Sequence, residues 1–296
     1  MRKLHFTNSF LACAIVALGF TPTAHAAANR TFVSTLGNDS NTSVNCSASA
    51  HCRTFSAALS VTNPGGEIVV VDSGGYGPVT INQAVTISAI GIVASISQPS
   101  SGENAITIST TGNVTLIGLG LHGLAGGNDG ILVSQVGVLR VFSLLIENFK
   151  NDGIEFASTG TLAMYDSNLN GNAANGLEVS AAGSVFVHNT GFDGNKTAGV
   201  LASNGNVTLA DSFAHGNASG VDGTGGTIAL FGDHLVLNTT AGISISSGSI
   251  TLANCLVTQN AKPYVISGGS LSGSNPATSL LTGTGTGTPA AATALF

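Results

Sequence analysis

The sequence has few charged residues, very few basic ones and no tryptophan. Its 296 residues include 8 Lys and Arg and 14 Asp and Glu, so that charged residues make up 7% of the chain, against roughly 25% in an average globular protein. Nucleic-acid binding needs clustered Lys and Arg, and a net charge of −6 argues against such a partner. Apolar residues nevertheless reach 43%, which excludes a disordered chain. The solvent-facing surface must therefore consist mainly of Ser, Thr, Asn and Gly.

The chain also lacks an apolar run long enough to cross a bilayer. The longest, from Phe10 to Phe20, has about ten residues, whereas a membrane-spanning helix needs roughly 20. Arg2 and Lys3 precede it, and the small-residue sequence Ala24-His25-Ala26 follows. This arrangement predicts a signal peptide over residues 1–26 and a secreted or periplasmic protein without a transmembrane segment. The mature chain keeps 6 basic residues against 14 acidic ones, a formal charge of −8.

Cysteines are few, with four in the chain, of which Cys13 lies in the predicted signal peptide. An exported protein can form disulfides. Cys46 and Cys52 lie six residues apart in a polar segment, and closing so small a loop would contribute about 2 kcal/mol. We therefore predict a Cys46–Cys52 disulfide, with Cys255 as the free thiol.

Glycine is abundant, with 40 residues, and it recurs at a regular period. Successive spacings are 25, 23, 23, 22, 21, 22 and 21 for Gly112, Gly137, Gly160, Gly183, Gly205, Gly226, Gly248 and Gly269. A fixed period in this range is typical of a solenoid. Apolar and polar residues alternate after each of these glycines, as in Val207-Thr208-Leu209, which predicts a strand with one buried face.

Each repeat holds two further apolar segments, separated by turns. One contributes a single apolar column: Leu121, Ile146, Leu169, Phe192, Phe213, Leu235 and Leu256. The other opens with a glycine and an aliphatic residue, as in Gly176-Leu177. Coils stacked at about 4.8 Å would pair every strand in parallel with its copy one coil on. A leucine-rich repeat would need a Leu-rich consensus, and a sandwich has no fixed period. We predict an all-β fold, a parallel β-helix of three sheets with coils of 21 to 25 residues.

Two further columns of the repeat are assigned to the fold. Asparagines recur at spacings of 23, 22, 21 and 22 and should stack at a turn as a hydrogen-bonded ladder: Asn172, Asn195, Asn217, Asn238 and Asn260. Cys255 aligns with Ser167, Thr190 and Ser212, a column of small inward-facing residues. We therefore expect Cys255 to be a buried thiol that fills the core.

Both ends of such a solenoid need caps, because its open ends would expose apolar core. The stretch from Arg53 to Thr62 places Phe55, Ala58 and Leu59 at helical spacing, which predicts a short capping helix. The C-terminal end is low in complexity. We divide the chain into a signal peptide (1–26), an N-terminal cap (27–66), the β-helix (67–269) and a low-complexity C-terminal segment or cap (270–296).

The cap sequence resembles that of a known superfamily. The stretches in question are Thr31-Phe32-Val33-Ser34, Gly37-Asn38-Asp39-Ser40-Asn41, Cys52-Arg53-Thr54-Phe55 and Ala57-Ala58-Leu59. They resemble the N-terminal cap of bacterial right-handed β-helix proteins of the pectate-lyase-like superfamily. With the repeats, the resemblance covers residues 30 to about 270 and implies a right-handed solenoid. It implies no single activity, because the superfamily includes polysaccharide lyases, glycoside hydrolases, phage tailspikes and adhesins.

The first candidate site is a strip of rings. Phe142, Tyr165 and His188 share one outward position in consecutive coils, and rings about 4.8 Å apart can stack. The strip could hold the face of a sugar, with Arg140 and Lys150 as further substrate contacts, or it could merely stiffen the sheet.

The second candidate site is a set of carboxylates. Asp129 and Asp152 occupy the same slot in two Asn-Asp-Gly-Ile turns, and Glu155 and Glu178 share an outward strand position. Carboxylates this close raise one another's pKa or recruit a cation. Asp152, Glu155 and Glu178 are therefore candidate catalytic groups, and Asp129 with Asp152 a possible Ca²⁺ site. The alternative is turn chemistry for the aspartates. We expect both candidate sites on one face, built by the coils from 138 to 190.

The resemblance also offers a check on activity. Lyases of this fold pair acidic Ca²⁺ ligands with a basic residue, for which Arg140, Lys150 and Lys196 are the candidates here. The Asn-Thr-Asp, Gly-Asp-Asp, Gly-His-Gly and Arg-Ile-Lys motifs of the related hydrolases do not occur. We therefore expect a secreted, monomeric, non-catalytic protein without a cofactor that binds polysaccharide or is displayed at the cell surface. The alternatives are a polysaccharide lyase or glycoside hydrolase, and a purely structural or adhesin-like protein.

Overall fold

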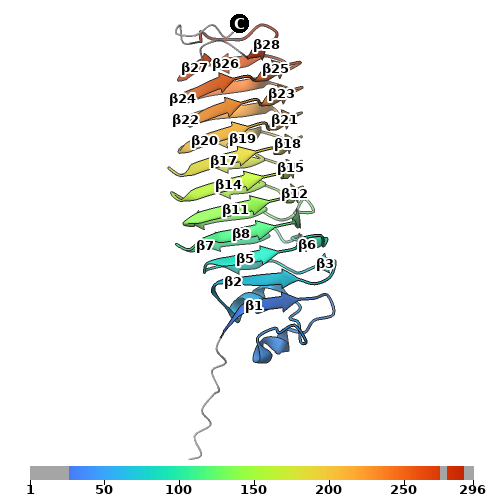
Figure 1. The fold of residues 1–296 in the computed structure, drawn as a ribbon. Helices are drawn as coiled ribbons and strands as arrows, with labels where there is room; N and C mark the ends of the chain where they lie inside the picture. Colours follow the sequence, from blue (N-terminus) through green and yellow to red (C-terminus); the bar gives the residue numbers. More distant parts are fainter. Residues whose placement is uncertain (1–26, 274–278, 290–296) are drawn as a thin grey trace, which may run out of the picture.

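The chain forms a column of stacked coils (Figure 1). The computed structural model describes residues 27–273 and 279–289. The predicted signal peptide, and residues 274–278 and 290–296 of the predicted C-terminal segment, lie outside these ranges. Within them, no helix combines the length and the apolar character that crossing a membrane requires.

Each coil crosses three ladders of parallel strands. Ladder 1 runs across the front of the column in Figure 1 and contains β1 (Ala28–Val33), β2 (Thr62–Val70), β5 (Val85–Ser88), β8 (Val114–Ile117), β11 (Val138–Phe142), β14 (Thr161–Tyr165), β17 (Ser184–His188), β20 (Asn206–Ala210), the second halves of β22 (Ser219–Phe231) and β24 (Ala241–Ala253), and β27 (Ser270–Gly273). Ladder 2 contains β4 (Val79–Ile81), β7 (Ile106–Ser109), β10 (Ile131–Gln135), β13 (Ile154–Phe156), β16 (Leu177–Val179), β19 (Ala198–Ala202), the first halves of β22 and β24, and β26 (Tyr264–Ile266).

Ladder 3 runs along the right side of the column in Figure 1 and contains β3 (Gly74–Gly75), β6 (Ala94–Ser97), β9 (Leu119–His122), β12 (Leu145–Glu147), β15 (Asn168–Asn170), β18 (Gly191–Asp193), β21 (Phe213–His215), β23 (His234–Val236), β25 (Leu256–Thr258) and β28 (Leu280–Leu281). Strands β22 and β24 pass through both ladders 1 and 2, which join into one 18-stranded sheet, while ladder 3 is a separate 10-stranded sheet. The predicted three-ladder parallel solenoid is confirmed.

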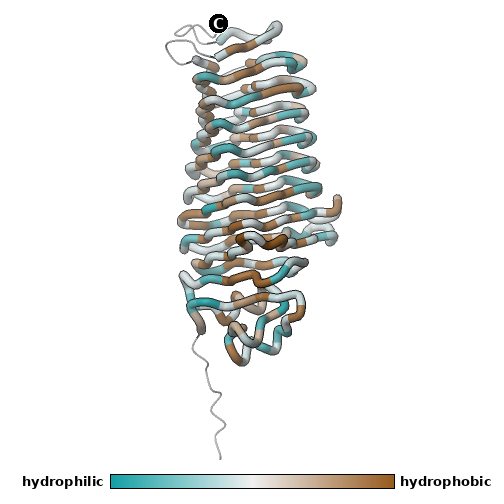
Figure 2. Tube along the Cα trace, turned by 45° about the vertical axis from the view of Figure 1, so that its right-hand side comes forward, coloured by the Kyte–Doolittle hydropathy of each residue, from teal (hydrophilic) through white to brown (hydrophobic). Residues whose placement is uncertain are grey.

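The core lies inside the coils, where the alternating residues of each strand meet. Leu139, Leu162 and Val185 pair in register on ladder 1 and are buried, and hydrophobic and hydrophilic residues alternate along the coils (Figure 2). The predicted column on ladder 3 is wrong at two positions. Phe192 pairs with Ala214, so Phe213 faces outward and is 46% exposed. Likewise Val257, not Leu256, fills the core. At both positions the prediction chose the larger of two neighbouring apolar residues, whereas the register places the smaller one inside.

A glycine stands at the start of the ladder-2 strands from β10 to β24, because the next coil leaves no room there for a side chain. A Cβ at Gly176 would lie 2.7 Å from the carbonyl oxygen of Gly199 and 2.8 Å from Cδ1 of Phe192. The same contact with the next coil occurs at Gly130, Gly153, Gly199 and Gly220. The repeated glycines therefore set how closely the coils stack.

The asparagine column forms a continuous ladder between ladders 3 and 2. Oδ1 of Asn217 accepts from the backbone N–H of Asn195 at 2.8 Å and from its side-chain amide at 3.1 Å. The amide of Asn195 also donates to the Leu169 carbonyl. The same pattern links Asn172 to Asn195, Asn217 to Asn238, and Asn238 to Asn260. These bonds satisfy turn groups that would otherwise be buried without a partner.

A second polar column occupies the turn between ladders 1 and 3. Ser212 accepts through Oγ from the backbone N–H of Thr190, its counterpart one coil earlier. Cys255 lies in this column, is buried as predicted, and donates from Sγ to a backbone carbonyl. Between the two lies Asp233, which sequence analysis did not single out. It is fully buried, and its oxygens accept from the backbone N–H groups of Ser212 and Phe231, each at 2.8 Å.

The N-terminal cap consists of η1 (Asp39–Val44) and α1 (Phe55–Ser60). The predicted capping helix is present as α1, with Phe55, Ala58 and Leu59 buried against the core. Thr54 caps it by accepting from the backbone N–H of Ala57.

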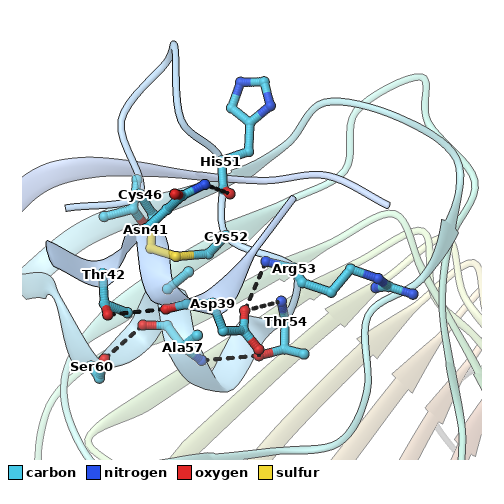
Figure 3. The surroundings of a disulfide bond; sticks show 12 residues. Asp39, Asn41, Thr42, Cys46, His51, Cys52, Arg53, Thr54, Ala57 and Ser60 are labelled. Atoms are coloured by element: carbon cyan, nitrogen blue, oxygen red, sulfur yellow. Dashed lines mark hydrogen bonds between the residues drawn. A yellow bond between two sulfur atoms is a disulfide. The ribbon is translucent and has the colours of Figure 1, made fainter. Parts of the chain in front are cut away.

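The predicted disulfide between Cys46 and Cys52 is confirmed, and both residues are buried (Figure 3). Asp39 lies beside it and accepts from the backbone N–H groups of Arg53 and Thr54 and from the Thr54 hydroxyl (Figure 3). The disulfide loop and the start of the helix are thus tied together.

Candidate functional site

The outward face of ladder 1 carries four rings in contact. Phe142, Tyr165 and His188 occupy one register position on β11, β14 and β17. The rings of Phe142 and Tyr165 lie 5.2 Å apart at an interplanar angle of 8°. Tyr165 also contacts His188 at 6.3 Å and Phe186 at 5.9 Å, both tilted by about 50°. We call Phe142, Tyr165, Phe186 and His188 the aromatic strip.

The geometry of the strip decides which surfaces are open. Phe142 and Tyr165 are nearly parallel and one coil apart, so their faces cover each other and their edges face solvent. Phe186 is inclined to Tyr165 and remains 37% exposed, which leaves part of its face open. The strip ends at small or aliphatic residues, Ala210 on one side and Ile117 on the other. It therefore both stiffens the sheet and presents a bounded aromatic surface.

Arg140 flanks this surface. It shares a register column with Phe186, with only Ala163 between them, and it is exposed. Within the described residues, no carboxylate forms an ion pair with it. Its guanidinium is free to contact a ligand on the strip.

The expectation of one common face for all candidate residues is wrong. The aromatic strip and Arg140 lie on ladder 1, whereas Glu155 and Glu178 lie on ladder 2. Lys150 lies in the turn between β12 and β13, between ladders 3 and 2. Alternation predicted that the aromatic residues and the two glutamates point outward, but the turns direct them to different sides of the coil.

The two aspartates are buried in turns. Asp129 is 0% exposed and accepts through Oδ1 from the backbone N–H of Asp152 at 3.1 Å. Asp152 is 2% exposed and accepts in the same way from Asn175 at 2.8 Å. Burial raises the pKa of Asp152 to about 7, and the nearby charges of Glu178 and Asp129 add to the effect. Both side chains therefore serve as hydrogen-bond acceptors for the backbone of the turns, as the alternative prediction stated.

These aspartates do not fit a Ca²⁺ site. Ca²⁺ takes about six to eight oxygen ligands, but the oxygens of Asp129 already accept from Asn128, Asn151 and Asp152. Nowhere in residues 27–273 and 279–289 do three or more His, Cys, Asp or Glu side chains converge as metal ligands.

Glu155 and Glu178 are direct neighbours on ladder 2 and are half-buried. Burial raises the pKa of Glu155, with the charges of Asp129 and Glu178 contributing. Glu178 accepts from the side chains of Asn175 at 3.3 Å and Ser203 at 3.4 Å. The described outward positions of this column include no Lys or Arg: Thr80, Thr107, Leu132, Glu155, Glu178, Leu201, Asp222, Ser244 and Val265. The arrangement suits acid/base chemistry by two carboxylates and not lyase chemistry, which pairs carboxylates with a basic residue.

Ladder 3 carries paired groups that sequence analysis did not single out. Nδ1 of His122 lies 3.0 Å from Oε1 of Glu147, its register neighbour. Nδ1 of His215 lies 3.9 Å from Oδ1 of Asp193, also a register neighbour. Aligning every repeat slot, rather than the strand segments alone, would have found both pairs.

Comparison with known proteins agrees with this architecture. A family model described as "Right handed beta helix region" matches residues 104–278. None of the curated proteins matches the chain. Among solved structures, pectate lyase Pel9A is similar at a TM-score of 0.57 and 15% identity, with 89% of this chain and 81% of that chain covered. ORF18 of Geobacillus virus E2 is similar at a TM-score of 0.49 and 14% identity, with coverages of 74% and 52%.

The family match spans more than half of the chain, and the coils, ladders and core alternation all agree with it. At 15% identity, the likeness to the pectate lyase concerns the fold. The chain therefore belongs to the right-handed β-helix family and shares the fold of pectate lyases.

Proposed function

We propose that this chain is an exported, non-catalytic β-helix protein that binds polysaccharide through the aromatic strip of ladder 1. The observation that carries the proposal is the unbroken contact of rings on that outward face, from Phe142 to His188. Aromatic side chains, with tyrosine adding a polar handle, contribute large contact areas to recognition surfaces. Arg140 beside the strip adds a hydrogen-bonding group that has no acidic partner among the described residues.

The shape of the site favours a polymer over a small molecule. The strip lies on an open face that continues along the column axis, and its rings repeat at the coil spacing of about 4.8 Å. An extended chain lying along the axis can contact several coils at once, whereas small-molecule sites are usually concave. Export rests on the N-terminal sequence, and the Cys46–Cys52 disulfide is compatible with it.

Replacing Tyr165 with Ala tests the proposal. The variant should bind a glycan recognised by the wild type more weakly by about 1–3 kcal/mol, the scale of losing one aromatic contact at the centre of an interface. Phe231→Ala is the matched control, because Phe231 occupies the same register column two coils beyond His188 and is 46% exposed. A glycan array first identifies a glycan that the wild type binds, and calorimetry then measures the affinity of each variant for it. Unfolding temperatures are recorded for both variants. Equal affinities in folded Tyr165→Ala and wild type would reject the strip as the binding surface.

A second candidate, glycoside hydrolysis, is favoured by Glu155 and Glu178. Retaining glycosidases place two carboxyl groups about 5 Å apart, close to the spacing of neighbouring coils, and one of this pair has a raised pKa. If it is correct, Glu155→Gln should abolish the release of new reducing ends from a panel of neutral and acidic glycans. Glu147→Gln, on ladder 3, is the control. Wild-type protein that releases no reducing ends, and no unsaturated products, would exclude this candidate.

A further inference from the structure

A hollow of about 410 Å³ lies in the turns between ladders 3 and 2, away from the aromatic strip. Its lining contains no acidic residue and consists of Ala125, Asn148, Phe149, Lys150, Gly171, Ala173 and Lys196. Its apolar surface comes from the small residues Ala125, Gly171 and Ala173, because Phe149 is only 1% exposed and belongs to the core. We call it the lysine hollow.

The repeat places the two lysines in one column. Lys150, Ala173 and Lys196 each follow the residue in the asparagine-ladder slot, and their backbones are bonded from coil to coil. The two lysines are therefore separated by two coil spacings, roughly 10 Å. The position between them is alanine, so the space between the ammonium groups stays open.

Both ammonium groups lack an acidic partner. No ion pair involves either lysine in the described part of the chain, where the ammonium group of Lys150 lies 3.5 Å from Oγ of Ser101. Basic residues are scarce in this chain, and both arginines of the cap have partners. Arg30 bonds Glu67, and Arg53 bonds the Gly75 carbonyl. Two unpaired cations around one hollow are thus a marked concentration of positive charge on an acidic protein.

One wall of the hollow is held in a conformation that side chains seldom adopt. Leu124 and Ala125 both have left-handed backbones, with φ of 50° and 58°, which cost energy for residues other than glycine. The N–H of Ala125 donates to the Asn148 carbonyl at 2.8 Å and holds this loop over the next coil. Leu124, which precedes Ala125 in this loop, is 60% exposed.

We propose that the lysine hollow binds an acidic saccharide. The two ammonium groups contact negatively charged substituents on the sugar residues, and the apolar surface around Ala173 contacts the saccharide between them. Lysine is a compact point charge that can pair with a carboxylate, a sulfate or a phosphate. The inference rests on the proposed function only in taking the ligand to be a saccharide. It goes beyond the proposed function in two respects: the saccharide is negatively charged, and it contacts a second surface of the protein.

The test compares three oligosaccharides of equal length, one carrying carboxylates, one carrying sulfates and one neutral, by calorimetry at low and physiological salt. We expect the wild type to bind at least one charged ligand more tightly than the neutral one. Lys150→Gln and Lys196→Gln should each weaken binding of that charged ligand about threefold and the double variant about tenfold, in the range of exposed ion pairs. The preference should shrink as salt screens the charges. Lys262→Gln removes the same charge from an exposed position elsewhere and should leave binding unchanged.

Ala173→Leu distinguishes binding in the hollow from general electrostatic attraction to the protein surface, because it fills the hollow without changing any charge. We expect it to weaken binding of the charged ligand and to spare the neutral one. Unchanged charged-ligand affinity in both the double lysine variant and Ala173→Leu would overturn the lysine hollow, while Tyr165→Ala would still report on the strip. If the wild type binds none of the three ligands, both proposals fall.

Discussion

The stability of the protein should fall as pH rises, because Asp233 is ionisable and fully buried. Burial raises its pKa from 3.8 to about 7, although two backbone N–H groups oppose the shift. Between those two values the folded chain holds a proton that the unfolded chain has released. The resulting stability is complete below pH 4 and is lost as pH rises through about 7.

The size of the effect follows from the two pKa values. A tenfold change in proton affinity corresponds to about 1.4 kcal/mol, so the full loss for Asp233 is on the order of 4 kcal/mol, and about 2–3 kcal/mol of it falls between pH 5 and pH 8. Asp152, whose pKa is also about 7, should contribute a similar loss. The wild type should therefore unfold at a clearly lower urea concentration at pH 8 than at pH 5.

Asp233→Ser isolates the contribution of Asp233, because serine occupies this slot elsewhere in the repeat. A serine there can accept from the N–H of Ser212, as Ser212 does from Thr190. The lost bond from Phe231 affects stability equally at both pH values. We expect the difference between pH 5 and pH 8 to shrink by about 2–3 kcal/mol in this variant. The measurement is urea unfolding followed by circular dichroism. The same difference in a folded variant and in the wild type would show that Asp233 is ionised throughout and that its backbone donors outweigh burial.

Two further predictions concern the coil spacing and the cap. Gly176→Ala should destabilise the protein by about 1–3 kcal/mol, the usual cost of overpacking, whereas Gly75→Ala, whose Cβ would meet nothing closer than 3.8 Å, should have little effect in the same urea assay. Labelling the unreduced, unfolded mature chain should find one free thiol, at Cys255, and removing the Cys46–Cys52 disulfide should cost about 2 kcal/mol. Three labelled thiols would contradict the disulfide.

The local pattern of the sequence was enough to predict the solenoid, because a β-helix is built from contacts between neighbouring repeats. Glycine spacing set the coil length, and alternation identified the inward residues of ladder 1. The asparagine slot was recognisable for the same reason, since a ladder needs the same residue at the same place in every coil. The capping helix and the Cys46–Cys52 pair depend on even shorter stretches of chain.

The candidate sites depended on information that local pattern does not contain. Alternation tells whether a side chain points inward or outward, but the direction of each turn decides on which side of the column it lies. The tertiary structure therefore separated Glu155 from Tyr165, although both point outward in the same coil. It also buried Asp129 and Asp152, because turns that pack against the next coil exclude water.

The lysine hollow shows the same division between sequence and tertiary structure. The slot shared by Lys150 and Lys196 can be counted along the sequence. The open space over Ala173 and the wall at Ala125 exist only once the coils have stacked, because they are contributed by different coils. The sequence by itself thus determined the repeat and its core, and the stacking of turns decided which outward residues meet.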